Sequence, residues 1–440
     1  MEYSSRGLPE ARRVLARTAM ATLLATSFLS LPAAAQDGLD TSEAVTLTIS
    51  TTPGSSNALF TWAGESFMEK YPNVTLEVVE YETDWYNQNA VRLFNSSDRP
   101  DLGFFWLTGF YSALVETGAL LPLDDFYKES GLIDVLPESS IQIAVAADGV
   151  KYGVPFNSIM SPLLMYNKTA FAEAGIEGEP ETMEEFLALA EPLRAAGYIP
   201  WTSGLASPSQ ATQLFDINIR RYTDDETYAR LLSKDLMDYT SADMIAAFAN
   251  MQKMAETLMA PGAAGVADLE ARSLFAQEAA AIYSDGSWNL GSSGLGAELP
   301  EGFDLGIMSY PLARDDTDRS TGFYDANGIV IAAESPDTEW AKAFVSHILS
   351  YDLQSTMGQV ISGTPVRNDI PTDVLEVSYD PAVAQIYNRV VSEGTHRIFN
   401  TIMPGEYRPA ATQLIQGLIG GQLTPEEFAE EFTAMVQSVH

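Results

Sequence analysis

Residues 45–79, VTLTISTTPGSSNALFTWAGESFMEKYPNVTLEVV, decide the fold class of this chain. Apolar residues alternate with mostly polar ones from Val45 to Ser50 and again from Val74 to Val79, and this period of two predicts two β-strands. Between them, apolar residues recur at helical spacing from Ala58 to Tyr71, and Pro72 ends the run. Strand, helix and strand in this order predict a βαβ unit, and therefore an α/β fold built on a parallel sheet.

Further elements are indicated along the chain. A second helix is expected from Asp84 to Phe94, and a short buried strand from Asp101 to Phe105. Thr182 and Glu185 have the spacing of a capping box, which predicts the start of another helix. Pro192 falls within that helix and is expected to kink it, because proline removes one backbone hydrogen bond.

The first 35 residues have the three-part pattern of a secretory signal peptide. Arg12, Arg13 and Arg17 precede an apolar run from Thr18 to Leu31, and small residues follow up to Ala35. A membrane anchor is the alternative, but the run is shorter than the roughly 20 residues needed to span a bilayer. We therefore expect cleavage after Ala35 and export of the remaining chain to the periplasm.

The composition excludes several classes of protein. Among 440 residues there are 60 Asp and Glu against 24 Lys and Arg, so the formal net charge is −36. Such acidity argues against binding nucleic acid, whose phosphates need clustered basic side chains. The absence of cysteine excludes disulfides, zinc fingers and thiol nucleophiles. The three histidines, His347, His396 and His440, are too far apart in sequence to suggest a histidine-rich metal site.

No catalytic motif stands out. The chain lacks the HExxH, Walker and GxSxG patterns. The acidic run from Asp315 to Asp318 lacks the glycine and the distal glutamate of a calcium-binding EF-hand loop, so we interpret it as a solvated loop. With so many carboxylates, a glycosidase-like pair can arise by chance. We therefore expect no catalytic residue, no metal site and no cofactor.

Several segments, taken in order, resemble one family. They are Phe67–Val74, Arg99–Leu102 with Gly118–Asp124, Asp148–Pro155, Leu164–Lys168, Ala279–Trp288 after Phe275, and Gly363–Arg367. This pattern is similar to that of the extracellular solute-binding proteins of ATP-driven importers, in the carbohydrate-binding family that includes maltose-binding protein. Glu278 stands where that family usually has glycine. The resemblance extends from about Val45 to Val439.

The resemblance implies a periplasmic-binding-protein fold of two α/β lobes. Each lobe is then discontinuous in sequence, and a multi-segment hinge joins them. The expected crossings are Pro155–Ser158, Tyr324–Gly328 and Thr364–Arg367. Lobe one would comprise residues 37–156 plus 327–363, and lobe two residues 157–326 plus 364–440. A ligand would lie in the cleft between the lobes, and hinge closure would create the surface that a membrane permease reads.

A sugar site needs flat aromatic rings for the C–H faces and polar side chains for the hydroxyls. Trp288 follows the turn Asp285-Gly286-Ser287 after a short apolar strand, where the family has a stacking tryptophan. Trp106 ends the strand that begins at Asp101, and the family often has a cleft aromatic there. Asn157 lies at the first crossing, where the family has a polar ligand contact. Asp285 either caps its turn or binds a hydroxyl.

Other candidates follow a strand end, open a helix, lie at the second crossing or, for the pair after Pro404-Gly405, could close the cleft from lobe two, and for each the alternative is loop capping or packing. They are Ser55, Ser56, Asn57, Tyr86, Asn87, Tyr324, Asp325, Asn327, Tyr407 and Arg408. The remaining tryptophans, Trp62, Trp85, Trp201 and Trp340, are assigned to structural packing, with a ligand role left open for Trp85 and Trp201.

These expectations converge on a periplasmic carbohydrate receptor of an ABC transporter. It would bind a mono- or oligosaccharide or a polyol, act as a monomer, perform no catalysis, and deliver its ligand to permease subunits in the inner membrane. One alternative is a periplasmic carbohydrate-active enzyme. Another is the same fold binding a polyamine or other cationic solute, against which the cleft aromatics Trp288 and Trp106 argue.

Overall fold

A computed structural model describes most of the chain. The described residues are 39–107, 109–233, 235–290, 294–314, 320–324, 327–361, 363–371, 373–375, 381–393, 395–398 and 407–439. The predicted signal peptide, residues 1–35, lies outside them, as do Asp325 and the acidic run 315–318. None of the helices described has both the length and the apolarity needed to cross a membrane.

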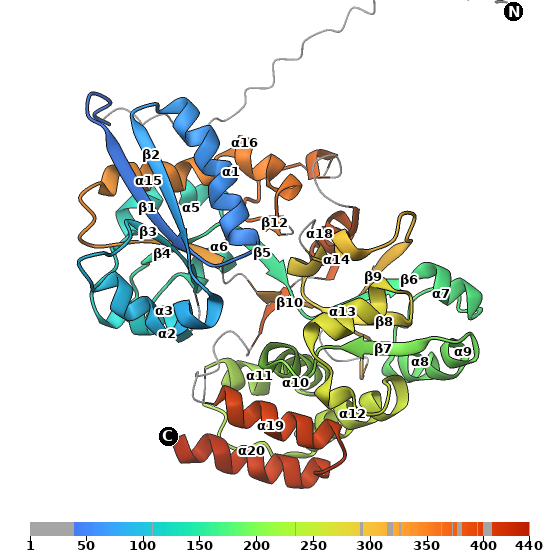
Figure 1. The fold of residues 1–440 in the computed structure, drawn as a ribbon. Coiled ribbons are helices and arrows are strands. Elements are labelled where there is room, and N and C mark those ends of the chain that lie inside the picture. Colours follow the sequence, from blue (N-terminus) through green and yellow to red (C-terminus); the bar gives the residue numbers. More distant parts are fainter. Residues whose placement is uncertain are drawn as a thin grey trace, which may run out of the picture. The chain divides into compact units, whose positions relative to one another are not determined.

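The first sheet has the strand order β2-β1-β3-β11-β4 (Figure 1). Its strands are β1 (Val45–Thr51), β2 (Val74–Glu80), β3 (Leu102–Trp106), β4 (Gly153–Pro155) and β11 (Asn327–Ile331). β1 pairs in parallel with β2 and β3, whereas β11 runs antiparallel to β3 and to β4. Leu47 and Ile49 are fully buried, as their alternation predicts. The expected strand 101–105 is confirmed as β3, one residue further along.

Helix α1 (Ser55–Lys70) completes the predicted βαβ unit and begins three residues earlier than expected. The reason is Gly54, which has a φ of 94° and allows the chain to turn directly from strand into helix. Phe67 of α1 makes edge-to-face contacts with Trp340 and Phe344 of α15 (Thr338–Ile348), with ring centroids 6.4 and 5.2 Å apart. These rings belong to a core cluster that also contains Leu47, Ile49 and other buried residues of the first sheet.

Other helices accompany the first sheet. They are α2 (Thr83–Phe94), α3 (Gly109–Glu116), α4 (Asp124–Glu129), α5 (Leu132–Val135), α6 (Glu138–Ile143) and α16 (Tyr351–Thr356), followed by the short helix η4 (Met357–Gln359). The helix expected over 84–94 is confirmed as α2. It packs through Tyr86 and Phe94 into a second cluster with Phe105 and Tyr111. This cluster fixes the junction between β2 and α2, which adjoins the candidate site.

A small sheet connects the two main ones, with the order β12-β5-β10-β13. Its strands are β5 (Asn157–Met160), β10 (Thr321–Tyr324), β12 (Thr364–Pro365) and β13 (Thr395–Arg397). The chain therefore changes sheets between Pro155 and Asn157 and again between Tyr324 and Asn327. Gln354 donates to the Phe156 carbonyl at 2.9 Å and accepts from the Val366 amide at 3.0 Å. One buried side chain thus ties the segment near Phe156 to the segment near Val366.

The second main sheet has the order β7-β8-β6-β9. Its strands are β6 (Leu163–Asn167), β7 (Ile199–Ser203), β8 (Ala280–Asp285) and β9 (Leu305–Met308). β7 and β8 are parallel, and β6 runs antiparallel to both β8 and β9. The carboxyl ends of β7 and β8 therefore meet at one edge, together with the start of β6.

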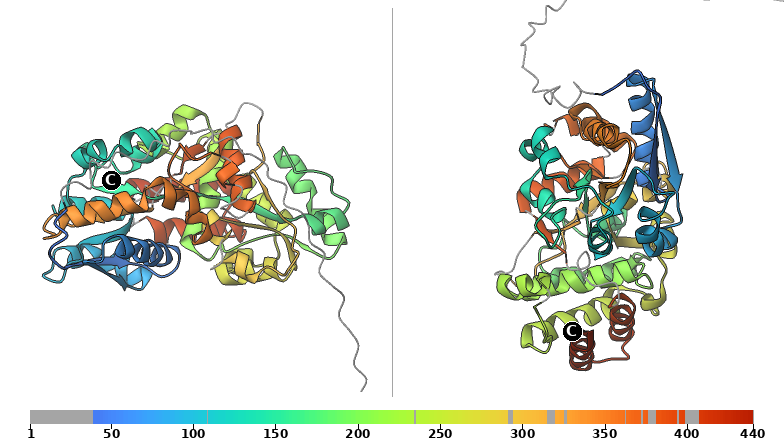
Figure 2. Two further views of the ribbon diagram at one scale, coloured as in Figure 1. Left: turned by 90° about the horizontal axis from the view of Figure 1, so that it is seen from above. Right: turned by 90° about the vertical axis from the view of Figure 1, so that its left-hand side faces the viewer.

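Helices surround the second sheet, and α10, α12, α19 and α20 pack against one another (Figures 1 and 2). The helices are α7 (Lys168–Glu173), α8 (Met183–Ala188), α9 (Ala190–Ala195), α10 (Pro208–Tyr222), α11 (Asp225–Leu232), α12 (Ala242–Leu258), η2 (Ala263–Gly265), α13 (Asp268–Ala276), η3 (Ser287–Leu290), α14 (Leu295–Glu298), α18 (Pro381–Glu393), α19 (Arg408–Ile419) and α20 (Pro425–Val439). Phe215 of α10 stacks on Phe432 of α20 with centroids 4.7 Å apart, which places aromatic rings at the centre of this bundle.

The helix predicted from the Thr182 capping box is present, with both capping bonds formed between Thr182 and Glu185. It is divided into α8 and α9 at Leu189. Pro192 explains the break, because it has no amide hydrogen to donate to the carbonyl of Ala188, four residues earlier. The expected kink is therefore confirmed.

Candidate ligand-binding site

The carboxyl edge of β7 and β8 carries the first half of the candidate site. Ser203 and Ser284 are paired across the parallel strands, and Asp285 lies opposite Leu163 of β6. Helix α10 begins five residues after β7 ends, at Pro208. Ligands of open α/β sheets bind at the carboxyl ends of such strands. This edge therefore brings together the carboxyl ends of β7 and β8, the turn that follows β8, and the polar start of α10.

Asp285 is the centre of a buried hydrogen-bond network. Its Oδ1 accepts from Gln210 Nε2 at 3.0 Å and from the Gly286 amide at 2.7 Å. Its Oδ2 accepts from the Tyr283 hydroxyl and from the Asn289 amide. Burial raises the pKa of Asp285, while these four donors oppose the rise. Both carboxylate oxygens are engaged within the protein, which favours the turn-capping role over direct contact with a hydroxyl.

Trp288 lies in η3, immediately after this network. A Cβ added to Gly286 would lie 2.0 Å from Cζ3 of the indole, so the ring is in close contact with the Gly286 backbone. Only glycine allows this approach, because any larger residue would displace the ring. The indole is partly exposed, whereas its neighbours Ser287 and Asn289 are buried. The turn thus presents a fixed aromatic ring at the strand edge, as the sequence predicts.

Asp268, the first residue of α13, lies behind the same turn. Burial, together with the negative charge of Asp285, raises the pKa of Asp268 to about 6. The carboxylate is so close to Gly204 that a Cβ there would be 1.9 Å from Oδ1. Arg272, one turn along α13, donates to Asn289 at 3.2 Å and pairs with Glu298 at 2.7 Å. These bonds connect α13, η3 and α14 behind Trp288.

Sequence reasoning did not identify the residues of this supporting shell, namely Gln210, Asn289, Asp268 and Arg272. One local signal could have pointed to Gln210 as a site residue. It lies at the start of a helix that opens with Ser-Pro, soon after a strand end. Nothing local indicates that it contacts Asp285, which lies 75 positions further along the chain.

The carboxyl ends of β1, β2 and β3 form the corresponding edge of the first sheet. Trp106 ends β3, is half-buried, and packs edge-to-face on Phe104 with centroids 4.7 Å apart. Asn327 at the start of β11 is paired in register with Trp106 and is 9% exposed. Phe104 and Phe105 are buried in the core. Trp106 and Asn327, which are far apart in sequence, are therefore neighbours at this edge.

The polar residues that open α1 lie at the same edge. Ser56 is buried and donates to the Thr52 carbonyl at 3.1 Å, while Thr51 donates to its hydroxyl at 3.0 Å. Asn57 is half-buried, and its amide donates to the carboxylate of Glu80 at the end of β2. Ser55 is half-buried at the first position of the helix. Asn57 and Ser55 are thus better placed to meet a ligand than Ser56.

Tyr86 is a core residue. Its side chain is 0% exposed, and its hydroxyl donates to the Phe104 carbonyl at 3.0 Å and lies 2.8 Å from Ser50 Oγ. Burial raises the pKa of Tyr86 above its usual value. We therefore assign Tyr86 to packing and leave it out of the proposed site. Its neighbour Asn87 lies on α2, but its side chain is outside the described structure.

The first crossing carries Asn157, which is 2% exposed. Its Oδ1 has no hydrogen-bond partner within the described part of the chain, and its Nδ2 lies close to Gly363, where a Cβ would be 2.5 Å away. At the second crossing, Tyr324 ends β10, but its side chain is not described, and Asp325 lies outside the described residues.

Tyr407 and Arg408 begin α19. Tyr407 is 5% exposed and belongs to the core cluster of the second sheet, whereas Arg408 is half-buried. Burial favours the packing role for Tyr407.

Of the remaining tryptophans, Trp201 and Trp340 are buried and Trp62 packs against the core of the first sheet, so their structural assignment is confirmed. Trp85 is the exception among these tryptophans, because 37% of its side chain is exposed and burial does not assign it to the core.

A cavity of about 980 Å³, distinct from the two strand-end edges, lies between the ends of α12 and α19 and the segment 260–265. None of the residues that the sequence predicts as ligand contacts lines it. Within the described residues, no group of three or more His, Asp or Glu side chains is placed to hold a metal ion. The candidate site therefore consists of the two strand-end edges, with aromatic and amide side chains as its chemistry.

Comparison with known families matches residues 50–355 to the model for bacterial extracellular solute-binding proteins. The chain belongs to this family. An uncharacterized ABC transporter extracellular-binding protein of Pyrococcus horikoshii is 23% identical over 396 residues, which cover 88% of this chain and 81% of that one. A protein of Mesorhizobium japonicum named "probable sugar-binding periplasmic protein" is 24% identical over 330 residues, which cover 73% and 75% of the two chains.

The fold of this extracellular solute-binding protein is likewise shared with solved structures. A chitin oligosaccharide binding protein superposes with a TM-score of 0.75 at 21% identity, covering 90% of this chain and 98% of that one. At this level of identity the likeness establishes the fold. The architecture is the two-lobed α/β fold of periplasmic binding proteins, as the resemblance implies, with discontinuous lobes joined by several segments.

Proposed function

We propose that this solute-binding protein is a periplasmic receptor that binds a carbohydrate or a related polyol and delivers it to the permease of an ABC transporter. The observation that carries the proposal is the Trp288 ring, held against Gly286 by the buried Asp285 network at the end of β8. A fixed, partly exposed indole next to amide side chains has the chemistry that a pyranose ring requires. Family membership and the sugar-binding names of its relatives support the same reading.

The proposed contacts come from both strand-end edges. Trp288 belongs to the second-sheet edge, and Trp106, Asn57 and Asn327 to the first. Further candidates are Ser55, Asn157, Tyr324, Asp325, Asn87 and Arg408. Lobe one is proposed to comprise residues 37–156 plus 327–363, and lobe two residues 157–326 plus 364–440. A ligand that contacts both lobes stabilises the closed state by the difference in its affinity for the two states.

The same proposal covers export and partners. Residues 1–35 act as a signal peptide, and the exported protein is a monomer without catalytic activity. The closed receptor presents a surface spanning both lobes to the permease subunits. The acidic surface suits a diffusing receptor, since a net charge far from zero keeps a protein soluble.

A thermal-shift screen over monosaccharides, oligosaccharides, polyols and polyamines tests the ligand class. A ligand at about 100 times its Kd should add about 2.7 kcal/mol of stability, which is readily measured as a rise in melting temperature. Stabilisation by a polyamine and by no sugar or polyol would overturn the carbohydrate assignment. Turnover of a glycoside by the purified protein, lost on removal of one carboxylate, would instead establish an enzyme.

Gly286→Ala tests the role of Trp288. The added Cβ must displace the indole, so the affinity for the sugar found in the screen should fall by about tenfold or more. The matched control is Gly265→Ala, because a Cβ at Gly265 meets no atom within 4 Å. Equal affinities for both variants, measured by titration calorimetry, would show that Trp288 is not a ligand contact.

A further inference from the structure

Helix α13 packs against β7 and β8, and its first residue, Asp268, lies close to the turn that carries Trp288. A Cβ added to Gly204, which follows β7, would lie 1.9 Å from Asp268 Oδ1 and 2.6 Å from its Cα. The carboxylate also forms a hydrogen bond with the side chain of Ser207, the residue before α10, and faces the charge of Asp285. Asp268 therefore contacts the start of α10 and acts on the turn after β8.

A second contact joins α13 to the same turn. Arg272 donates to Asn289 at 3.2 Å, and Asn289, which directly follows Trp288, donates to Asp285. The Gly286 amide, two residues before the indole, also donates to Asp285. The chain on both sides of Trp288 is thus bound to one carboxylate, so a force on Asp285 is transmitted to the ring.

The charges around Asp268 do not balance. Among the described residues, the charged and titratable groups that face it are Asp285 and Tyr283 of β8 and Arg272 of its own helix. Arg272 also pairs with Glu298 of α14 at 2.7 Å. The segment between β7 and α10 that contacts Asp268 brings no charge. One guanidinium is therefore shared by three carboxylates.

The surroundings of Asp268 disfavour its charged form. Its Oδ1 is excluded from solvent and has no hydrogen-bond partner within the described residues. A charged oxygen without a donor is costly in such a place. Burial and the charge of Asp285 accordingly raise the pKa of Asp268 to about 6, while the Ser207 hydrogen bond and Arg272 oppose the rise. Asp268 therefore gains its charge between about pH 5 and about pH 7.

Ionisation of Asp268 places a second negative charge near Asp285 in a region shielded from water. Repulsion between charges is screened only weakly there, so it favours a displacement of the turn from α13. A sugar stacked on Trp288 requires the undisplaced turn, in which the two carboxylates face each other. Binding of the sugar then raises the proton affinity of Asp268, and by linkage the affinity for the sugar falls as the pH rises.

We propose that Asp268 is a positioning residue for Trp288 and that its protonation couples sugar binding to pH. With a neutral Asp268, the turn holds the indole in the position described. With a charged Asp268, repulsion from Asp285 works against this position and the sugar is bound more weakly. This inference rests on the proposed carbohydrate receptor function and adds a means of regulating it.

Titration calorimetry with the full-length exported protein tests the coupling, using the sugar found in the screen. The affinity of the wild type should fall by about tenfold from about pH 5 to about pH 8, which corresponds to a rise of about one unit in the pKa of Asp268 on binding. Asp268→Asn cannot ionise. Its affinity should be constant within about twofold over this range and should exceed that of the wild type at about pH 8.

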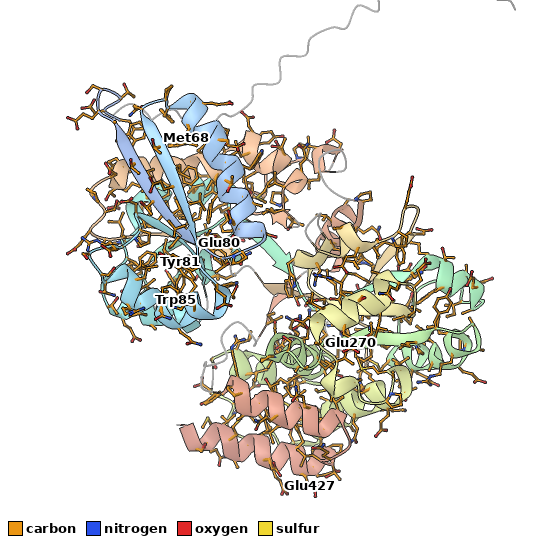
Figure 3. All side chains as sticks on the ribbon, viewed as in Figure 1. Met68, Glu80, Tyr81, Trp85, Glu270 and Glu427 are labelled. Atoms are coloured by element: carbon orange, nitrogen blue, oxygen red, sulfur yellow. The ribbon has the colours of Figure 1, made fainter. Side chains whose placement is uncertain are left out.

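Glu270→Gln is the matched control, because Glu270, labelled in Figure 3, is an exposed carboxylate on the same helix. It should keep the pH profile of the wild type, and melting temperatures report whether each variant is folded. A further measurement uses the wild type alone. Binding at about pH 6, compared in buffers of different ionisation enthalpy, should take up a fraction of a proton for each sugar bound.

Two results would overturn the coupling and leave the receptor function intact. One is a wild-type affinity that does not change with pH and is accompanied by no proton uptake. The other is an Asp268→Asn variant that keeps the pH profile and the proton uptake of the wild type. A wild-type protein that binds no carbohydrate at any pH would overturn both the coupling and the proposed function.

Discussion

The two strand-end edges hold their aromatic rings by different means. At the second sheet, the Trp288 turn is fixed by a buried carboxylate with four hydrogen-bond donors. At the first sheet, Trp106 and Trp85 are held by other rings, through the contacts with Phe104 and Tyr81. The position of Trp288 thus depends on a polar network, whereas Trp106 and Trp85 pack against other aromatic rings.

This difference determines how each edge responds to mutation. A buried network loses most when a shared acceptor is removed, because every donor left behind pays the cost of desolvation. An aromatic stack loses the contact area of the deleted ring, and no charged group is left buried without its partners. The second-sheet edge should therefore be more sensitive to a polar substitution than the first.

Asp285→Ala should have the largest effect. Removal of the carboxylate leaves Gln210, Tyr283 and Asn289 without their common acceptor, and the free energy of unfolding should fall by about 3 kcal/mol. Urea denaturation measures the change. The exposed Glu431→Ala is the control and should stay within about 0.5 kcal/mol of the wild type. A loss below about 1 kcal/mol for Asp285→Ala would contradict the central role of the network.

Asp268→Asn should change how stability depends on pH. The pKa of this carboxyl is raised by burial from 3.8 to about 6, so the folded state holds the proton more tightly than the unfolded state does. Ionisation therefore destabilises the wild type progressively as the pH rises from about 4 to about 6. The variant, which has no charge to lose, should melt at a higher temperature than the wild type near pH 7, and this advantage should shrink towards pH 4. A melting-temperature difference that stays constant over this range would refute the assignment.

Tyr86→Phe should have the smallest effect and tests the first-sheet edge. It removes a hydroxyl that bonds Phe104 and Ser50, so the free energy of unfolding should fall by about 1 kcal/mol. Sugar affinity should be unchanged, since Tyr86 is buried. Tyr152→Phe is the matched control, because its hydroxyl donates to Asp148 at the protein surface and should matter less. Loss of affinity in Tyr86→Phe, with stability kept, would return this residue to the ligand site.

Local patterns were sufficient for most of the secondary structure at the two edges. Alternating residues located β1 and β2, and helical spacing located α1, because these periods reflect which side chains face a core. The Thr182 capping box and the break near Pro192 follow from backbone hydrogen bonding within a few residues. The turn before Trp288 was also recognised, since a glycine between a strand end and a large aromatic ring is a local feature.

The candidate site was less predictable. Tyr86 and Trp85 are adjacent positions of one helix, and the sequence favoured Tyr86 as the ligand contact. In the structure Tyr86 is 0% exposed and Trp85 is 37% exposed. An aromatic side chain suits a core as well as a binding surface, so its residue type does not reveal which of the two it occupies. The choice depends on tertiary packing, because Tyr86 and Phe94 of α2 share one buried cluster with Phe105 of β3 and Tyr111 of α3.

The sequence by itself determined the α/β class, the capped helices and the family. These properties depend on residues close together in the chain, or on an ordered set of motifs. The tertiary structure alone decided that Gln210 bonds to Asp285, that Asn327 lies beside Trp106, and that Trp85 rather than Tyr86 faces solvent. The two contacts join segments distant in sequence, and the burial of Tyr86 depends on residues of other elements, so the packing of whole sheets and helices, not a local preference, decides all three.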